Sequence, residues 1–199
     1  IIYFVEKYGK RGSVLSKHPV NERSVFLKTF TVCLIVWGGL FLLYFPGTGM
    51  NDTINCLMGF WQNTLQPAMF QVIIYGVFQG IFFMCKNATI AYAIIVILQI
   101  FAASYVVANY LRWIVRKGIA KWLLILNMIY IMAMPLIGNY TIALLKDTWF
   151  TYALFLLLPN IYDLIHGEKT CWWQIVVAVF FVWFSRSNGK LVLVPIMVV

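Results

Sequence analysis

Residues 90–111, IAYAIIVILQIFAASYVVANYL, decide the fold class of this chain. The stretch is 22 residues long and holds no charged side chain. About 20 consecutive apolar residues are enough for a helix to cross the hydrocarbon core of a bilayer. The whole chain is 63% hydrophobic and 11% charged, whereas about a quarter of the residues are charged in a soluble domain. We therefore predict an all-α, polytopic transmembrane helical bundle.

Six further apolar segments surround this one, at residues 29–45, 68–85, 122–138, 148–165, 172–185 and from 191 onward. Each is expected to be helical, because backbone groups in lipid need partners within their own segment. We interpret residues 1–28 as a cytoplasmic N-terminal segment and residues 29–199 as the transmembrane module. The chain begins at Ile1 and stops inside an apolar run, so we expect it to be a fragment truncated at its C-terminus.

Basic residues predict the topology. They cluster before residue 29 and again between residues 112 and 121, at Arg112, Arg116, Lys117 and Lys121. Both clusters are expected on the cytoplasmic side, so one of the three apolar segments between them does not span. The best candidate is the segment 68–85, which is short and polar in places. We predict an embedded amphipathic helix within a large first external loop, residues 46–89; the alternative is that this segment spans and the charge rule fails here.

The net charge of +9 comes mainly from these loop residues. It therefore indicates a lipid bilayer as the partner and gives no reason to expect nucleic acid. The four cysteines, Cys33, Cys56, Cys85 and Cys171, lack metal-ligand spacing. We expect free thiols, with a disulfide between Cys56 and Cys85 as the alternative.

Two of the six acidic residues, Asp52 and Asp147, fall on the outer face in this topology. Ionisable groups beside apolar segments are costly and usually functional. Asp52 is a candidate general base or cation ligand; alternatively it caps a helix starting near Thr53. Asp147 follows Lys146 at a predicted helix start, where the pair could bind a phosphate and hold a hydroxyl or a metal. The alternative for Asp147 is an acid that only complements the helix dipole.

Four more candidate residues belong to the same face. Arg186 and Asn188 follow the segment 172–185, and arginine suits bidentate phosphate binding. The alternative for Arg186 is an interfacial anchor. Gln66 and Pro67 begin the embedded helix and are candidates for a substrate loop, although proline at a helix start is common.

These motifs stand in the order Phe45-Pro46-Gly47, Asp52, Gln66-Pro67, Lys146-Asp147 and Arg186-Ser187-Asn188-Gly189. The pattern resembles membrane glycosyltransferases of the GT-C class, related to the dolichyl-phosphate-mannose protein mannosyltransferases, and within them a poorly characterised bacterial branch. One departure is Gln66-Pro67-Ala68, where that branch commonly has His-Pro-Pro. The resemblance covers about residues 44–197, most of the chain.

The resemblance implies a GT-C-like fold and a defined chemistry. A sugar would move from a polyprenyl-phosphate donor to an acceptor on the outer face of a bacterial plasma membrane. Asp52 would act as the base, and Asp147 would assist it or hold a divalent cation such as Mg²⁺ or Mn²⁺. Lys146, Arg186 and Asn188 would bind the donor phosphate. The alternatives are a lipid or polysaccharide transporter or flippase, or a non-catalytic subunit of a membrane assembly.

Overall fold

The computed structural model describes residues 21–50, 53, 57, 69–186, 189 and 191–193, without the side chains of Phe70 and Lys121. Its named elements are all helices: α2 (Glu22–Leu43), α4 (Met69–Cys85), α5 (Ala88–Arg116), α6 (Lys121–Ala133), α7 (Pro135–Ile142), α8 (Lys146–Ile165) and α9 (Trp172–Ser185). Within these residues the only extended pairing is an isolated bridge between Thr48 and Ala143. The prediction of an all-α chain is confirmed.

Three helices, α2, α5 and α8, are long and apolar enough to cross a membrane. The pair α6 and α7 would add a fourth span if it is counted as one, bent by 59°. The apolar helices α4 and α9 are shorter. Large apolar side chains are widely exposed, for example Ile35 at 68% and Phe83 at 73%, which suits a surface that faces lipid.

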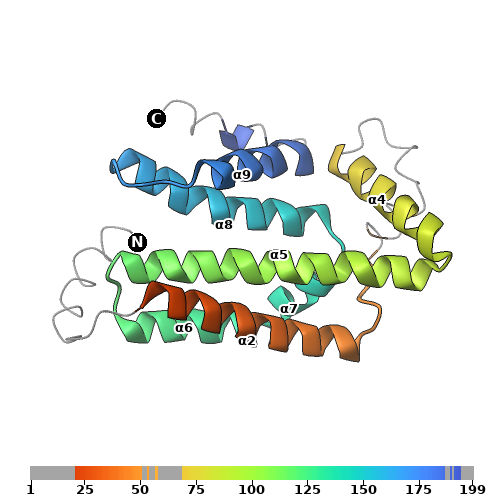
Figure 1. The fold of residues 1–199 in the computed structure, drawn as a ribbon, viewed down its shortest axis with the longest axis horizontal. Helices are drawn as coiled ribbons and strands as arrows, with labels where there is room; N and C mark the ends of the chain where they lie inside the picture. The colour runs from red at the N-terminus through yellow and green to blue at the C-terminus, as the bar shows by residue number, and fades with distance from the viewer. Residues whose placement is uncertain are drawn as a thin grey trace.

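Helix α5 is the centre of the bundle. In Figure 1 it lies between α8 and α9 on one side and α2 and α6 on the other. Small residues along it, including Ala91, Ala103 and Ala108, have no exposed surface. Small residues allow helices to approach closely, which is how packing replaces the hydrophobic effect between helices in lipid.

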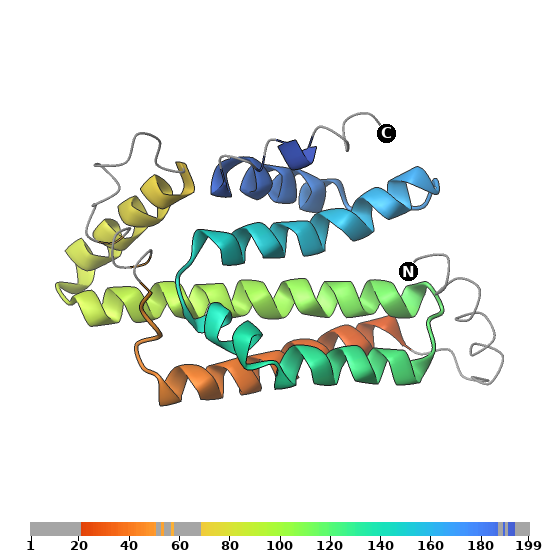
Figure 2. The ribbon, with the colours of Figure 1, turned by 180° about the vertical axis from the view of Figure 1, so that it is seen from behind.

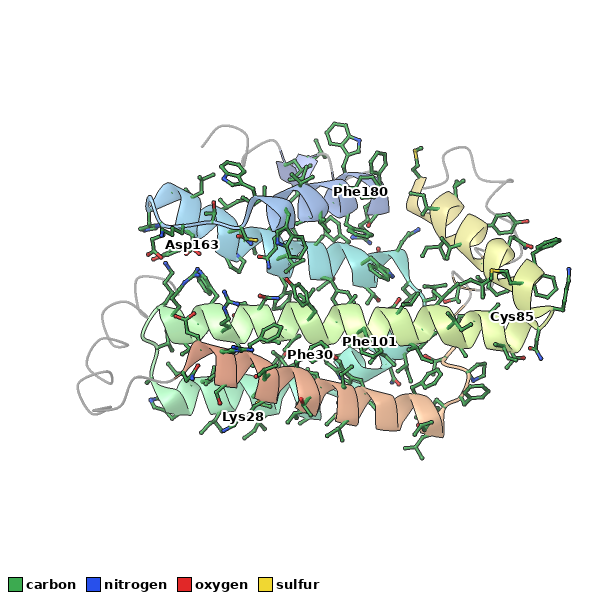
Figure 3. The ribbon with its side chains drawn as sticks, in the orientation of Figure 1. Lys28, Phe30, Cys85, Phe101, Asp163 and Phe180 are labelled. Atoms are coloured by element: carbon green, nitrogen blue, oxygen red, sulfur yellow. The ribbon has the colours of Figure 1, made fainter. Side chains whose placement is uncertain are left out.

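The direction of α2 and α5 follows from an ion pair. Glu22, at the start of α2, lies 3.7 Å from Arg112 near the end of α5. The two helices are therefore antiparallel, and the segment 44–87 leaves and re-enters the bundle at the same end (Figure 1). We call the end with Arg112 and Asp163 the basic end and the other the Asp147 end. Figure 3 labels Asp163 at one end and Cys85 at the other.

Helix boundaries agree well with prediction at α4 and α9. Helix α2 begins seven residues before the predicted residue 29. The reason is Asn21, whose side chain accepts hydrogen bonds from the backbone N–H groups of Arg23 and Ser24, at 3.0 and 3.3 Å.

The prediction of one helix over 122–138 is wrong. The chain breaks at Met134, and Pro135 starts α7 in a new direction (Figure 2).

Candidate functional site

The described part of the predicted site consists of Lys146, Asp147 and Arg186. Lys146 and Asp147 are in the first turn of α8, and Arg186 directly follows α9. Asp147 and Arg186 are 39 residues apart in the sequence and make contact at the Asp147 end. The other candidates, Asp52, Gln66, Pro67 and Asn188, lie outside the described residues.

Asp147 and Arg186 form an ion pair through two contacts. Arg186 Nη2 donates a hydrogen bond to Asp147 Oδ2 at 3.2 Å, and Arg186 Nε lies 2.7 Å from Oδ1. Both side chains are about half exposed, at 45% and 50%, but the Oδ1 atom itself is buried. The arrangement is a side-on pairing of guanidinium and carboxylate, which fixes the orientation of the arginine plane.

Arg186 keeps binding capacity after this pairing. A guanidinium carries five N–H donors, and one of them hydrogen-bonds to Asp147, while Nε makes only a close ion-pair contact. The ring of Phe150, one turn further along α8, lies 5.8 Å from Arg186 Cζ and supports the guanidinium plane. The Nη groups therefore have further N–H donors for an oxyanion at a half-exposed position.

The residue at the N-cap of α8 has no polar side chain. It is Leu145, and it makes no capping hydrogen bond through its side chain. Asp147 lies within the first turn, where an acid complements the helix dipole, as the alternative reading expects. A helix start beside a lysine and an arginine is a favourable environment for a phosphate.

A buried glutamine holds the backbone that leads into this helix. Gln99 of α5 has no exposed surface. Its Nε2 donates to the carbonyl oxygens of Tyr140, Thr141 and Ala143, at 3.1, 2.9 and 2.7 Å. Its Oε1 accepts from Trp149 Nε1 at 2.9 Å. One side chain thus ties the end of α7 and the first turns of α8 to the central helix.

The chain after α2 clamps the same backbone from another direction. The N–H of Thr48 donates to the Ile142 carbonyl at 3.2 Å. Thr53, which follows Asp52 in the sequence, donates through its hydroxyl to the Leu144 carbonyl at 2.8 Å. Gly47 has a φ of +123°, and a Cβ there would lie 2.7 Å from the Ile142 oxygen. The glycine of the Phe45-Pro46-Gly47 motif is therefore required both by its backbone conformation and by this close approach.

The glycine of the second motif also has a packing role. The N–H of Gly189 donates to the Arg186 carbonyl at 3.0 Å, closing a turn after α9. A Cβ on Gly189 would lie 1.9 Å from the Val182 carbonyl oxygen. Only glycine fits here without moving the turn that presents Arg186.

We predict that Gly189→Ala lowers the free energy of unfolding by about 1–3 kcal/mol, because the turn must move away from α9. Thermal unfolding of the purified protein in detergent measures this. The matched control is Gly76→Ala in α4, where a Cβ meets nothing within 4 Å; it is expected to be neutral or slightly stabilising. Equal effects at the two glycines would contradict the steric explanation.

A second polar cluster lies at the basic end. The carboxylate of Asp163 is 3% exposed and pairs with Arg116 and with Lys117, whose Nζ is 2.8 Å from Oδ1. Trp113 Nε1 also donates to Oδ1, at 2.9 Å. Lys117 makes a second pair with Glu168 at 2.6 Å. Arg116 and Lys117 thus lie at the same end of the bundle as Asp163 in the last turns of α8 and Glu168 just after it.

No protein-family model matches the chain, and comparisons with curated proteins and with solved structures give no match. The functional argument therefore depends on the geometry.

Sequence reasoning missed Gln99, Thr53 and Phe150 as residues that support the candidate site. An amide in the middle of a 22-residue apolar run was the available signal for Gln99. Cys85 is a free, exposed thiol, while Cys56 lies outside the described residues.

Proposed function

We propose that this chain is the membrane part of a GT-C-type glycosyltransferase that uses a polyprenyl-phosphate sugar as its donor. The observation that carries the proposal is the side-on pair of Asp147 and Arg186 at the start of α8. It presents a guanidinium, a lysine and a helix N-terminus at one place, all of which favour a phosphate. A lipid-linked donor keeps its phosphate at the edge of the bilayer, where helix ends lie.

In the proposed reaction the bond between sugar C1 and the donor phosphate oxygen breaks. The acceptor hydroxyl oxygen forms the new bond to C1, and its proton passes to the carboxylate of Asp52. Arg186 and Lys146 stabilise the charge on the departing lipid phosphate. Asp147 is a positioning residue, because its carboxylate orients the guanidinium of Arg186. The hydrogen bond from Thr53 to Leu144 supports this assignment, since it ties the chain directly after Asp52 to the segment before Lys146.

The resemblance also implies a divalent cation on Asp52 and Asp147, but the Asp147 carboxylate does not suit one. Arg186 meets both of its oxygens, and a guanidinium at this distance repels a second cation. Within the described residues, no group of three or more His, Cys, Asp or Glu side chains could hold a metal ion. We therefore assign no step to a metal.

The proposal includes α4 as a helix embedded at the Asp147 end that guides the donor lipid. Two observations support this. The segment 44–87 returns to the end that it left (Figure 1), so one full crossing by α4 would bring the chain to the wrong side. Helix α4 also has 17 residues, which at 1.5 Å per residue is about 26 Å, and it packs against α5 and α9. In this topology the basic end faces the cytoplasm.

The test uses the full-length protein in liposomes with polyprenyl-phosphate-linked mannose or glucose as the donor probe, and follows loss of sugar from the carrier. Asp147→Asn is expected to lower the turnover about 100-fold, because it removes the anion that orients the arginine. Arg186→Lys keeps the charge but loses the side-on geometry, and about a tenfold loss is expected. Glu22→Gln is the matched control, because it removes an acid at the opposite end and leaves turnover unchanged.

A charge exchange separates catalysis from stability. The double variant Asp147→Arg with Arg186→Asp retains an ion pair between α8 and α9, so thermal stability is expected to recover. Turnover is expected to remain low, because a carboxylate would then stand at position 186, where the proposal has the guanidinium bind the donor phosphate. Full turnover in Asp147→Asn would show that the proposed role of this pair is wrong.

A further inference from the structure

A polar cavity of about 460 Å³ opens at the basic end, far from the proposed site. It lies between α5, α8 and the start of α9, and its lining includes three cations, Arg112, Arg116 and Lys169, and one acid, Asp163. Along α8, Asp147 and Asp163 are 16 residues apart, which corresponds to about 24 Å. The cavity is therefore separate from the pair of Asp147 and Arg186.

The positive charge of this cavity is only partly neutralised. Asp163 is shared between Arg116 and Lys117. Among the described residues Arg112 forms an ion pair only with Glu22, at 3.7 Å and with both side chains more than 40% exposed, a pairing that contributes little. Lys169 is exposed and forms no ion pair with any described residue. An anion that entered the cavity would therefore meet an excess of positive charge.

An apolar cavity of about 300 Å³ adjoins the polar one. The two share Tyr105, Leu156 and Trp173. From these residues the apolar cavity continues along α8 as far as Trp149, and Ala102 and Ala178 form part of its wall. It leads from the basic end along α8 to the first turn of that helix.

We propose that the two cavities together bind one lipid with a phosphate headgroup. The phosphate lies among Arg112, Arg116 and Lys169, and an acyl or prenyl chain occupies the apolar cavity. Charge complementarity selects an anionic headgroup, and the adjoining apolar volume selects a lipid over free phosphate. The N-terminus of α9 adds to the attraction, because Cys171 at its N-cap position provides no side-chain cap. This inference does not depend on the proposed function.

The test is native mass spectrometry of the detergent-purified protein, titrated with phosphatidylglycerol or phosphatidylcholine. Phosphatidylglycerol is expected to bind more tightly. The double variant Arg112→Gln with Lys169→Gln is expected to weaken its binding about 30-fold, at roughly 1 kcal/mol for each cation near a lipid phosphate. The fold should survive, because Asp163 keeps both of its partners. Lys28→Gln is the matched control: Lys28 is an exposed cation on α2, less than two turns from Glu22 (Figure 3), and it does not line the cavity.

Two further measurements distinguish a lipid headgroup from free inorganic phosphate as the bound group. Ala102→Trp fills the apolar cavity without changing any charge, and it is expected to weaken phosphatidylglycerol binding as well. Inorganic phosphate at millimolar concentration is expected not to displace the bound lipid. The proposal is overturned if the two lipids bind equally, if the double variant behaves like Lys28→Gln, if Ala102→Trp binds normally, or if inorganic phosphate displaces the lipid.

Discussion

Replacing Asp163 by Asn is expected to lower the free energy of unfolding by about 3–5 kcal/mol. The carboxylate is 3% exposed and neutralises both Arg116 and Lys117. An amide of the same shape keeps the hydrogen bond from Trp113 but leaves the two cations without their buried counter-charge. Removing one partner of a buried ion pair costs more than the pair itself contributes, because the remaining charge is only partly solvated; the side chains of Arg116 and Lys117 are 34% and 16% exposed. Chemical unfolding in mixed detergent measures the change.

The control variant for this prediction uses the same lysine. Glu168 pairs with Lys117 at 2.6 Å, but its side chain is 45% exposed, so Glu168→Gln is expected to cost less than about 1 kcal/mol. The two variants remove one negative charge each from neighbouring positions. If they destabilise the protein equally, burial of Asp163 is not what makes its ion pairs important.

The alkaline behaviour of the cluster follows from Lys117. Burial lowers the pKa of this lysine, but hydrogen bonds to Asp163 and Glu168 and their negative charges outweigh burial, so the pKa is raised above 10.5. A raised pKa of a cation means that its contribution to stability is complete below the unfolded value and is lost as the pH rises through the folded value. Lys117 is therefore fully charged over the whole physiological range, and its contribution to stability is lost only at alkaline pH, as the pH rises through its raised pKa.

Hydropathy predicted the apolar helices well and their interruptions poorly. The segment 172–185 matches α9 at both ends, because polar residues flank it on each side. The break at Met134 was missed although Pro135 was visible in the sequence, since the apolar run continues through it. Proline removes a backbone N–H donor wherever it stands in a helix. The packing around it decides whether the helix continues, as α8 does through Pro159, or ends, as α6 does before Pro135.

The sequence predicted the charged residues of the candidate site but not the neutral residues that support them. Lys146, Asp147 and Arg186 stood out because ionisable residues are rare in this chain. Their pairing across 39 residues depends on how α8 and α9 pack, which no local pattern specifies. The supporting residues are neutral, so the charge argument could not find them. A neutral amide in an apolar helix carries little information until its partners are known.

Gln99→Leu is the second variant with a large expected effect, about 4 kcal/mol of lost stability. The carbonyls of Tyr140 and Thr141 belong to the last turn of α7, where intrahelical donors run out. Gln99 donates to the Thr141 and Ala143 carbonyls and accepts from the indole N–H of Trp149, and leucine would remove all three hydrogen bonds. The Tyr140 carbonyl would keep the hydroxyl of Thr148 as a donor, at 3.2 Å. Each buried polar group left unpaired costs roughly 1–3 kcal/mol. Thermal unfolding in detergent checks the loss.

Asn127→Leu is the informative comparison, because Asn127 is also a neutral amide in an apolar helix. Its Nδ2 donates only to the Leu123 carbonyl one turn back, at 2.9 Å, and an interior helix carbonyl there already accepts a backbone bond. Its loss is expected to cost less than about 1 kcal/mol. Loss of sugar from the carrier should slow with Gln99→Leu but not with Asn127→Leu, since of these two amides only Gln99 fixes the backbone ahead of Lys146 and Asp147. If both variants lose stability and turnover to the same extent, the effect belongs to amides in these helices generally and the positioning role of Gln99 is wrong.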